Sequence, residues 1–402
     1  MTRITEGLGE LGSPGKTLAC VLGDIDLLRA LGLAGIPCVV VAKPGAPTRH
    51  SRFAHRVLDW SDAWDQPEEL LNTLLRFAAE QSEPPVLFYE EDRELLLVSR
   101  YRDRLAESFR FVVPEATLVE DLVDKARFQI LADRLDLPVP RARRLEPGAE
   151  SIPADLSLRY PLIVKPLTRR TDRWEPIAQS AKALQVDTPA ALGQLWPRLA
   201  DAGMVVLAQE LVPGAESRIE SYHVYVDQQG HVVGEFTGQK IRTHPQTYGH
   251  STALVITDSA DVAAVGRDLV ERLGLRGVAK FDFKRGPDGR LYLLEVNARF
   301  TLWNHPGAVA GVNLPALVYR DLVGLPRSAA RRARPGVRWC KIWGDAVAAR
   351  AAGVPMSRWL PWALGCEAKR AFALDDPMPL VYGGLWRLAH RRPRAPVKSP
   401  AG

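Results

Sequence analysis

The stretch VAKFDFKRGPDGRLYLLEVNARF, residues 278–300, decides the fold, because local structure and chemistry agree in it. Two runs of strand-forming residues flank the turn sequence GPDG, a pattern that predicts a β-hairpin. Alternate side chains of a strand share a face, so Lys280 lies with Asp282 on the first strand. Glu295 and Asn297 share a face of the second strand. The hairpin therefore gathers polar side chains on one face of an otherwise apolar ribbon.

The register of this hairpin follows from the length of its loop. A two-residue loop at Asp288 and Gly289 places Asp282 opposite Glu295 and Lys280 opposite Asn297. A four-residue loop keeps the same faces, and only an odd-length loop without a compensating bulge separates them.

The paired carboxylates Asp282 and Glu295 would repel each other across the sheet, so we expect a cation between them. Carboxylate and amide oxygens are hard ligands that suit Mg²⁺, with phosphate oxygens and water completing its shell. The alternative is an exposed hairpin with ordinary surface charges, which the apolar neighbours of these residues disfavour.

The motif Lys-x-Asp, then thirteen residues from Asp282 to Glu295, then Glu-x-Asn-x-Arg resembles the metal-binding hairpin of the ATP-grasp superfamily. Most members of that family join a carboxylate to an amine. The resemblance implies ATP as a cofactor with one or two Mg²⁺ ions, or Mn²⁺ in their place. It also implies metal ligands at Asp282, Glu295 and Asn297, and catalytic roles for Lys280 and Arg299.

Two upstream lysines resemble the phosphate-binding lysines of the family. Lys125 follows Asp124 within a predicted charged helix over residues 118–137, and Lys165 ends an apolar strand over residues 160–166. A lysine at a strand tip holds a fixed ammonium where a phosphate charge can be bound. A solvated surface lysine is the usual alternative at both positions.

Residues 205–214 form an apolar strand that passes into a Pro-Gly turn, which resembles the hinge of the family between its two lobes. Such a segment has free backbone groups, as the edge of an adenine requires. The resemblance implies nucleotide contacts at Gln209, Glu210, Leu211, Val212 and Glu216, the last at the ribose hydroxyls.

The chain departs from the family pattern in residues 167–183, where a glycine-rich loop is expected but no glycine occurs. Arg169, Arg170, Arg173 and Lys182 occur there instead. Either these cations replace backbone N–H groups over the phosphates, or the segment serves a different acceptor.

Two further sets of residues are candidates for substrate binding. Lys240 and Arg242 have strand spacing on one face, which suits a substrate carboxylate or the transferred phosphoryl group, with exposed sheet charge as an equal alternative. Residues 303–305, Trp-Asn-His, are predicted to form a wall of the acceptor pocket.

The N-terminal pattern is that of an α/β fold. Apolar runs at residues 18–22 and 38–41 flank a helical pattern, which predicts a parallel sheet. A third run, at residues 86–89, leads into the acidic residues 90–92. These residues either line a ligand crevice at the end of the strand or begin the next helix.

The predicted organisation has three parts. Residues 1–116 resemble the three-layer parallel-sheet domain that precedes the ATP-grasp domain in many members. Residues 117–325 would form the two-lobed α+β ATP-grasp domain. Residues 326–402 would be an accessory segment with a basic, disordered tail from residue 391.

Composition supports a cytoplasmic protein. Its 402 residues are 46% hydrophobic and include four scattered cysteines without CxxC spacing, as expected of reduced thiols. No signal peptide or membrane span is recognisable.

The net charge is +6, but no nucleic-acid-reading module accompanies it, so no specific nucleic-acid partner is expected. A helix near residues 380–391 gives a weak indication of peripheral membrane contact. A homodimer is compatible with the sequence.

The implied function is an ATP-dependent ligase for small-molecule substrates. A carboxylate would attack the γ-phosphate to give an acyl phosphate and ADP, and an amine would then displace phosphate to form an amide. Such chemistry needs charge neutralisation and alignment from the protein. The alternatives are a small-molecule kinase on the same fold, an ATP-binding regulatory protein without turnover, and, from charge alone, a nucleic-acid binder.

Overall fold

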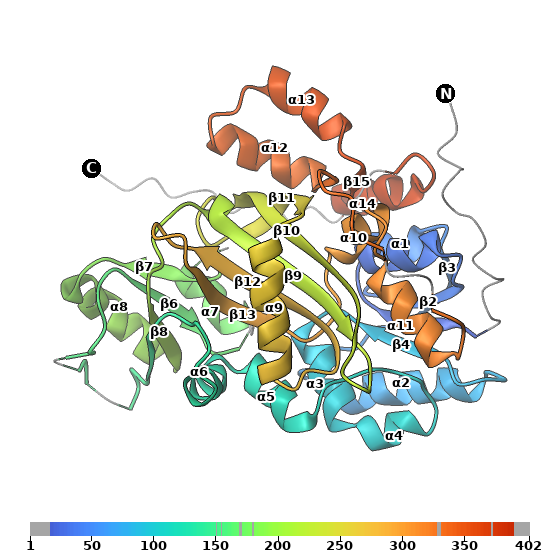
Figure 1. Ribbon diagram of the computed structural model, residues 1–402, viewed down its shortest axis with the longest axis horizontal. Coiled ribbons are helices and arrows are strands. Elements are labelled where there is room, and N and C mark those ends of the chain that lie inside the picture. Colours follow the sequence, from blue (N-terminus) through green and yellow to red (C-terminus); the bar gives the residue numbers. More distant parts are fainter. Residues whose placement is uncertain are drawn as a thin grey trace.

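The computed structural model describes residues 17–149, 151–153, 155–168, 171–178, 181–327, 331–370 and 373–389. These residues form two four-stranded sheets and one seven-stranded sheet, with helices packed around them (Figure 1). No helix in these ranges is long and apolar enough to span a bilayer.

The N-terminal sheet is parallel, in the order β3-β2-β1-β4. The three predicted apolar runs form β1, β2 and β4. Strand β3 was not predicted because its sequence, AHRVL, is that of a partly exposed edge strand. Residues 111–113, an apolar run before Pro114, have no regular structure. The strands are β1 (Ala19–Leu22), β2 (Cys38–Val41), β3 (Ala54–Leu58) and β4 (Val86–Tyr89).

Helices cover both faces of the N-terminal sheet, which confirms the predicted three-layer α/β arrangement. Helix α1 (Ile25–Leu33) packs on the face of Ala19 and Val21. Cys20 and Leu22 point to the opposite face, where α2 and α3 pack. The remaining elements of this region are η1 (Pro47–His50), α2 (Pro67–Ala79), α3 (Asp92–Arg100) and α4 (Arg102–Ala106).

The single helix predicted over residues 118–137 is divided in two. Asp124 ends α5 (Ala116–Val123) and caps α6 (Lys125–Arg134), because its carboxylate accepts hydrogen bonds from the backbone N–H groups of Ala126 and Arg127. The cap places Lys125 at the first position of the second helix.

The second sheet, which we call the central lobe, is antiparallel in the order β5-β8-β6-β7. Its apolar side chains, with Trp174 and Trp196, form a core of their own. The elements are β5 (Ala142–Leu145), β6 (Leu162–Pro166), α7 (Thr171–Ala178), β7 (Leu184–Val186), α8 (Pro189–Asp201) and β8 (Val206–Glu210).

The third and largest sheet has the order β13-β12-β9-β10-β11-β14-β15. Helix α9 (Ala260–Arg272) lies across its strands in Figure 1. Its elements are η2 (Glu216–Arg218), β9 (Ile219–Val226), β10 (Val232–His244), β11 (His250–Thr257), β12 (Gly277–Arg285), β13 (Leu291–Asn297), β14 (Arg338–Cys340) and β15 (Ala368–Lys369).

The N-terminal and large sheets share apolar cores, since one cluster contains Leu87, Val119, Tyr222 and Phe281 together. Two short strands from the predicted accessory segment, β14 and β15, extend the large sheet. The domain boundaries at residues 116 and 325 remain predictions. The other C-terminal helices are α10 (Asn304–Val309), α11 (Leu314–Leu322), α12 (Ile342–Ala351), α13 (Met356–Leu364) and α14 (Met378–Ala389).

Candidate active site

The hairpin of β12 and β13 has the predicted register at its polar residues. Asp282 pairs with Glu295, and Lys280 pairs with Asn297. The two-residue loop is wrong, because the last pair joins Arg285 to Leu291 and leaves five residues in the loop. A register shift after Asp282 compensates for this odd length, so both carboxylates stay on one face.

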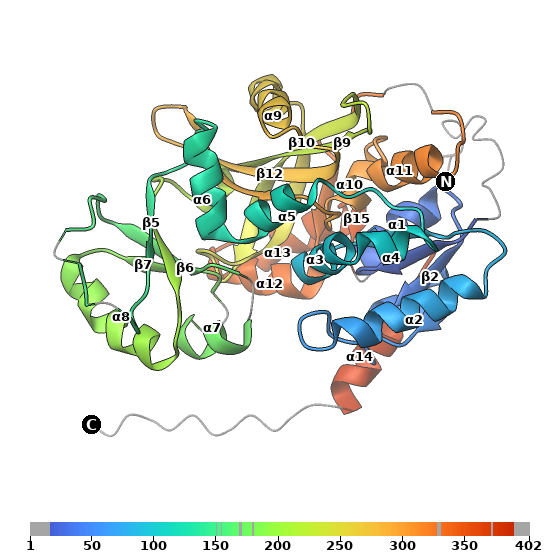
Figure 2. The same ribbon diagram turned by 90° about the horizontal axis from the view of Figure 1, so that it is seen from below.

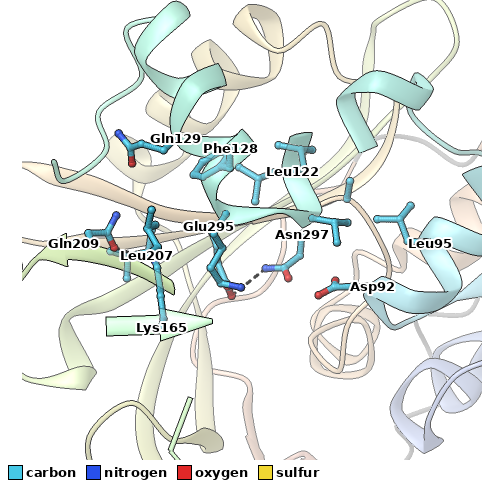
Figure 3. Close-up of a pocket in the computed structure, with 15 residues that line it drawn as sticks. Asp92, Leu95, Leu122, Phe128, Gln129, Lys165, Leu207, Gln209, Glu295 and Asn297 are labelled. Carbon is cyan, nitrogen blue, oxygen red and sulfur yellow. Dashed lines mark hydrogen bonds between the residues drawn. The ribbon is translucent and has the colours of Figure 1, made fainter. Parts of the chain in front are cut away.

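The side chains on this face already contact one another. Asp282 is 2% exposed, and its carboxylate accepts a hydrogen bond of 2.6 Å from Ser221 Oγ and another from Lys280 Nζ. The side-chain amide of Asn297 donates to Glu295 Oε1 at 3.2 Å, as Figure 3 shows. Two carboxylates and an amide oxygen are therefore held close to one another before any ion is considered.

These side-chain oxygens suit a divalent cation whose remaining ligands come from another molecule. Among the described residues, no cluster of three or more His, Cys, Asp or Glu side chains could hold a metal without help. Two carboxylates with one amide match Mg²⁺, which usually keeps waters or phosphate oxygens as its other ligands.

Lysines from other elements face the hairpin. Lys165, on β6, donates to Gln209 Oε1 at 2.9 Å. Burial, together with the charge of Lys125, lowers the pKa of Lys165 to about 8, although Glu295 opposes this shift. Lys125 donates from Nζ to the carbonyl of Leu167 at 3.1 Å. Two ammonium groups thus lie near each other at one side of the site.

A cleft of about 260 Å³ separates the central lobe from the large sheet and contains most of the predicted residues. A smaller pocket beside it, shown in Figure 3, is lined by Asp92, Lys165, Glu295 and Asn297. The predicted residues that line the main cleft are Lys125, Lys165, Gln209, Glu210, Leu211, Val212, Glu216, Lys240, Asp282 and Glu295.

Comparison with known proteins agrees with this geometry. A family model described as ATP-grasp in the biosynthetic pathway with Ter operon matches residues 224–343. The D-aspartate ligase of Enterococcus faecium (strain Aus0004) is 24% identical over 292 residues, which cover 69% of this chain and 68% of that protein.

Solved structures share the fold. An N5-carboxyaminoimidazole ribonucleotide synthetase in complex with ADP superposes with a TM-score of 0.62 and 17% identity, over 80% of each chain. An L-amino acid ligase from Bacillus licheniformis has a TM-score of 0.57 and 16% identity, over 78% of this chain and 75% of that one.

Residues 224–343 therefore resemble the ATP-grasp family, and the chain as a whole shares the fold of these two enzymes.

The cleft of this chain differs from the ATP-grasp pattern in the segment at its mouth. Helix α7 occupies the segment in which a glycine-rich loop was expected, and Trp174 anchors it by donating from Nε1 to the carbonyl of Ala181 at 2.9 Å. The backbone N–H of Lys182 donates to the carbonyl of Tyr248 at 3.0 Å. The central lobe thus touches the β10–β11 turn of the large sheet across the mouth of the cleft. Arg169 and Arg170, and the side chain of Arg173, lie outside the described residues.

Glu210, at the end of the predicted hinge strand β8, forms an ion pair with Arg159. The guanidinium of Arg159 donates to its carboxylate at 2.9 Å. Burial alone would raise the pKa of Glu210, but the hydrogen bonds from Arg159 outweigh it, so the pKa is lowered. The charged side chain of Glu210 therefore has a structural partner in Arg159.

Arg299 connects the hairpin of β12 and β13 to the N-terminal sheet, a link that no local sequence signal indicated. Its guanidinium donates to the carboxylate of Asp92, to the carbonyl of Glu90 at 2.8 Å and to Asn297 Oδ1 at 2.9 Å. The helix-start interpretation of the acidic residues 90–92 is confirmed, and the ligand crevice stays a prediction. Glu91 forms a capping box at the start of α3, while Asp92 reaches the site.

Arg242 does not share the cleft with Lys240, which corrects the expectation of one common face. The strand register shifts between these two residues, and neither described pocket includes Arg242. Its guanidinium instead donates to both oxygens of buried Asp345 on α12, at 2.9 and 2.6 Å, and lies over the ring of Trp362. Arg242 therefore attaches the C-terminal helices to the large sheet.

Trp303 is a core residue, so its predicted place in the acceptor-pocket wall is wrong. It is 1% exposed and packs near the ring of His223, at 4.9 Å between centroids. Gly238 lies against it so closely that a Cβ would come within 2.2 Å of the indole. Asn304 and His305 are also buried, and His305 Nδ1 lies 3.1 Å from Asp26 Oδ1.

Proposed function

We propose that the protein is an ATP-dependent carboxylate–amine ligase. The observation that carries the proposal is the opposition of Asp282 and Glu295 on one sheet to Lys165 and Lys125 across a single cleft. Paired carboxylates on one wall and ammonium groups on the other suit a polyphosphate and its counterion, which need both signs of charge at close range.

The nucleotide is proposed to enter with its base at the hinge and its phosphates between the lysines. Leu211 and Val212 give the base an apolar edge, and Glu216 lies on the route to the ribose. Lys165 and Lys125 neutralise phosphate oxygens. The lysines are already partly withdrawn from water, so little solvent has to reorganise when the charge shifts.

Asp282, Glu295 and Asn297 are proposed to hold Mg²⁺, with Mn²⁺ as the substitute to test. The ion supplies charge neutralisation to the phosphate oxygens and helps to align them. Lys280 holds Asp282 in place through its ammonium. Burial lowers the pKa of Lys280 and Lys240 lowers it further, while Asp282 and Glu295 oppose this change, so the lysine is sensitive to the charges around it.

The proposed reaction has two steps. A substrate carboxylate oxygen attacks the γ-phosphorus and forms a phosphorus–oxygen bond, while the bond to the bridging oxygen of ADP breaks. An amine then attacks the carbonyl carbon of the acyl phosphate, phosphate leaves with the bonding electrons, and the amine loses a proton.

Arg299 is proposed to act indirectly, by orienting the proposed metal ligand Asn297. Its nitrogens donate to acceptors of the protein in this structure, including Asn297 Oδ1, which it orients. From this position its positive charge would favour the negative charge that develops on the phosphates.

Amino acids are the first substrates to test, because D-aspartate ligase and L-amino acid ligase are, by name, ligases of amino acids. The test is hydroxylamine trapping: the protein, ATP and Mg²⁺ are incubated with a panel of D- and L-amino acids and other carboxylic acids. Hydroxamate together with ADP supports the ligase. ADP with a stable phosphorylated product and no hydroxamate supports a kinase, and ATP binding without ADP supports a regulatory protein.

A further inference from the structure

Helix α14 carries an apolar stripe that the fold leaves in water. The four side chains follow the spacing i, i+3, i+4 and i+7, which places them on one face of the helix. Pro379, on another face, is buried. The stripe consists of Met378, Val381, Tyr382 and Leu385, which are 41, 47, 43 and 55% exposed.

A buried anchor holds this helix in place. Asp376, two residues before the helix, is 1% exposed and accepts hydrogen bonds from Ser51 Oγ at 2.8 Å and from the backbone N–H of Arg52 at 2.9 Å. The guanidinium of Arg29 on α1 pairs with the same carboxylate at 3.3 Å. Tyr382 also stacks on His50, with 4.5 Å between ring centroids. The stripe therefore belongs to a helix that the N-terminal sheet positions.

The chain around the stripe is uniformly basic. Residues 377–402 contain no Asp or Glu, and they contain five Lys or Arg residues at positions 387, 391, 392, 394 and 398. On the folded surface nearby, the side chain of Arg52 is 58% exposed. The acidic residue on that surface, Asp375, lies 4.0 Å from Arg52, which offsets its charge.

We propose that α14 and the basic segment after it dock the protein on a bilayer surface that contains anionic lipids. Apolar side chains of an interfacial helix enter the boundary between headgroups and acyl chains, and Lys or Arg residues beside it attract anionic headgroups. With twelve residues, α14 is about 18 Å long, which is too short to cross the hydrocarbon core of a bilayer. It would lie along the surface.

The structure favours a bilayer over a second copy of this chain. Two copies packed through α14 would bring two basic segments together without acidic residues to pair with them. In Figure 2 the helix projects from the margin of the molecule, away from the sheets. Docking does not depend on the proposed ligase activity.

The test is co-sedimentation of the full-length protein with vesicles of phosphatidylcholine, with and without phosphatidylglycerol. We expect binding to the anionic vesicles that weakens as salt is added. The double variant Val381→Glu, Leu385→Glu should lower the partition coefficient by at least about tenfold, since it places charge in the apolar stripe. Arg391→Glu with Arg392→Glu should cause a similar loss on anionic vesicles only.

A matched control tests whether the effect belongs to α14. Leu360 on α13 is also an exposed leucine, and Leu360→Glu should leave vesicle binding unchanged. All variants should keep the unfolding transition and the ADP formation of the parent. Failure to sediment with either vesicle would overturn the proposal, and so would equal binding by the parent and the α14 double variant. A dimer that this variant dissociates, without vesicle binding, would assign the stripe to a second copy.

Discussion

The two walls of the cleft are built differently. The large sheet shares apolar cores with the N-terminal sheet, and Phe300 beyond its hairpin packs on Phe88 at 5.2 Å between ring centroids. The central lobe packs around a core of its own, centred on Val164, Val206 and Trp174. The β12–β13 hairpin is thus part of the larger body, whereas Lys165 belongs to a smaller unit.

This difference teaches where the site depends on long-range packing. The carboxylates are fixed by strand pairing within one sheet, and the neighbouring Asn297 is held by Arg299, whose partner Asp92 is 207 residues away in sequence. Lys165 is fixed by a strand of the small unit. The two walls meet through a few contacts, such as that between Lys182 and Tyr248. Substitutions in each wall should therefore fail in different ways.

The largest effect is expected on the wall of the large sheet. Glu295→Gln removes one of the paired charges that bind the counterion of ATP, so hydroxamate formation should fall by at least on the order of 10²–10³-fold. Circular dichroism should show an unchanged fold. Glu271→Gln, on the exposed surface of α9, is the matched control and should retain activity. Full activity in Glu295→Gln would reject the site.

The central-lobe wall should respond to pH. The ammonium of Lys165 has a pKa of about 8, so it is charged below that pH and loses its charge above it. We expect kcat/KM for ATP to fall about tenfold per pH unit above pH 8. Lys165→Arg should keep its charge and move this fall to higher pH.

Lys165→Met should lower kcat/KM for ATP on the order of 10²-fold at neutral pH and remove the pH dependence. If Lys165→Met kept the alkaline fall of the parent protein, another group would be responsible for it.

A smaller loss of activity is expected from breaking the ion pair between Arg299 and Asp92, which joins the β12–β13 hairpin to the N-terminal sheet. Asp92→Asn weakens the ion pair with Arg299, which orients Asn297, and should reduce kcat by about 10–100-fold. ATP affinity, measured by calorimetry, should change much less, because Asp92 does not line the main cleft. Asp103→Asn, on exposed α4, is the control. Equal losses in kcat and ATP affinity would show that the joint supports the whole cleft.

The smallest effect on chemistry is expected at Arg242. Arg242→Met leaves the buried carboxylate of Asp345 without its cation, so the free energy of unfolding should fall by about 3–5 kcal/mol. The kcat of the folded protein should stay close to that of the parent. Urea titration and steady-state kinetics on the same preparation separate the two quantities. A loss of kcat without a loss of stability would indicate that Arg242 acts in the active site.

The odd hairpin loop shows how far sequence reasoning reached. The alternation of polar residues predicted the pairing of Asp282 with Glu295, and this pairing is confirmed. The loop length was wrong, because a bulge near Leu294 and a five-residue loop together give the same register as a two-residue loop. Local sequence does not distinguish them, since both satisfy the same face pattern.

The sequence by itself determined the elements that depend on neighbouring residues. These include the strands of the β12–β13 hairpin with their faces and the order of the ATP-grasp motifs, because side-chain periodicity acts over a few residues. Tertiary structure alone decided that Asp92 meets Arg299, that Arg242 binds Asp345 rather than facing the cleft, and that Trp303 is buried. Each of these depends on which surfaces pack together, and the apolar cores that bring them together join residues hundreds of positions apart.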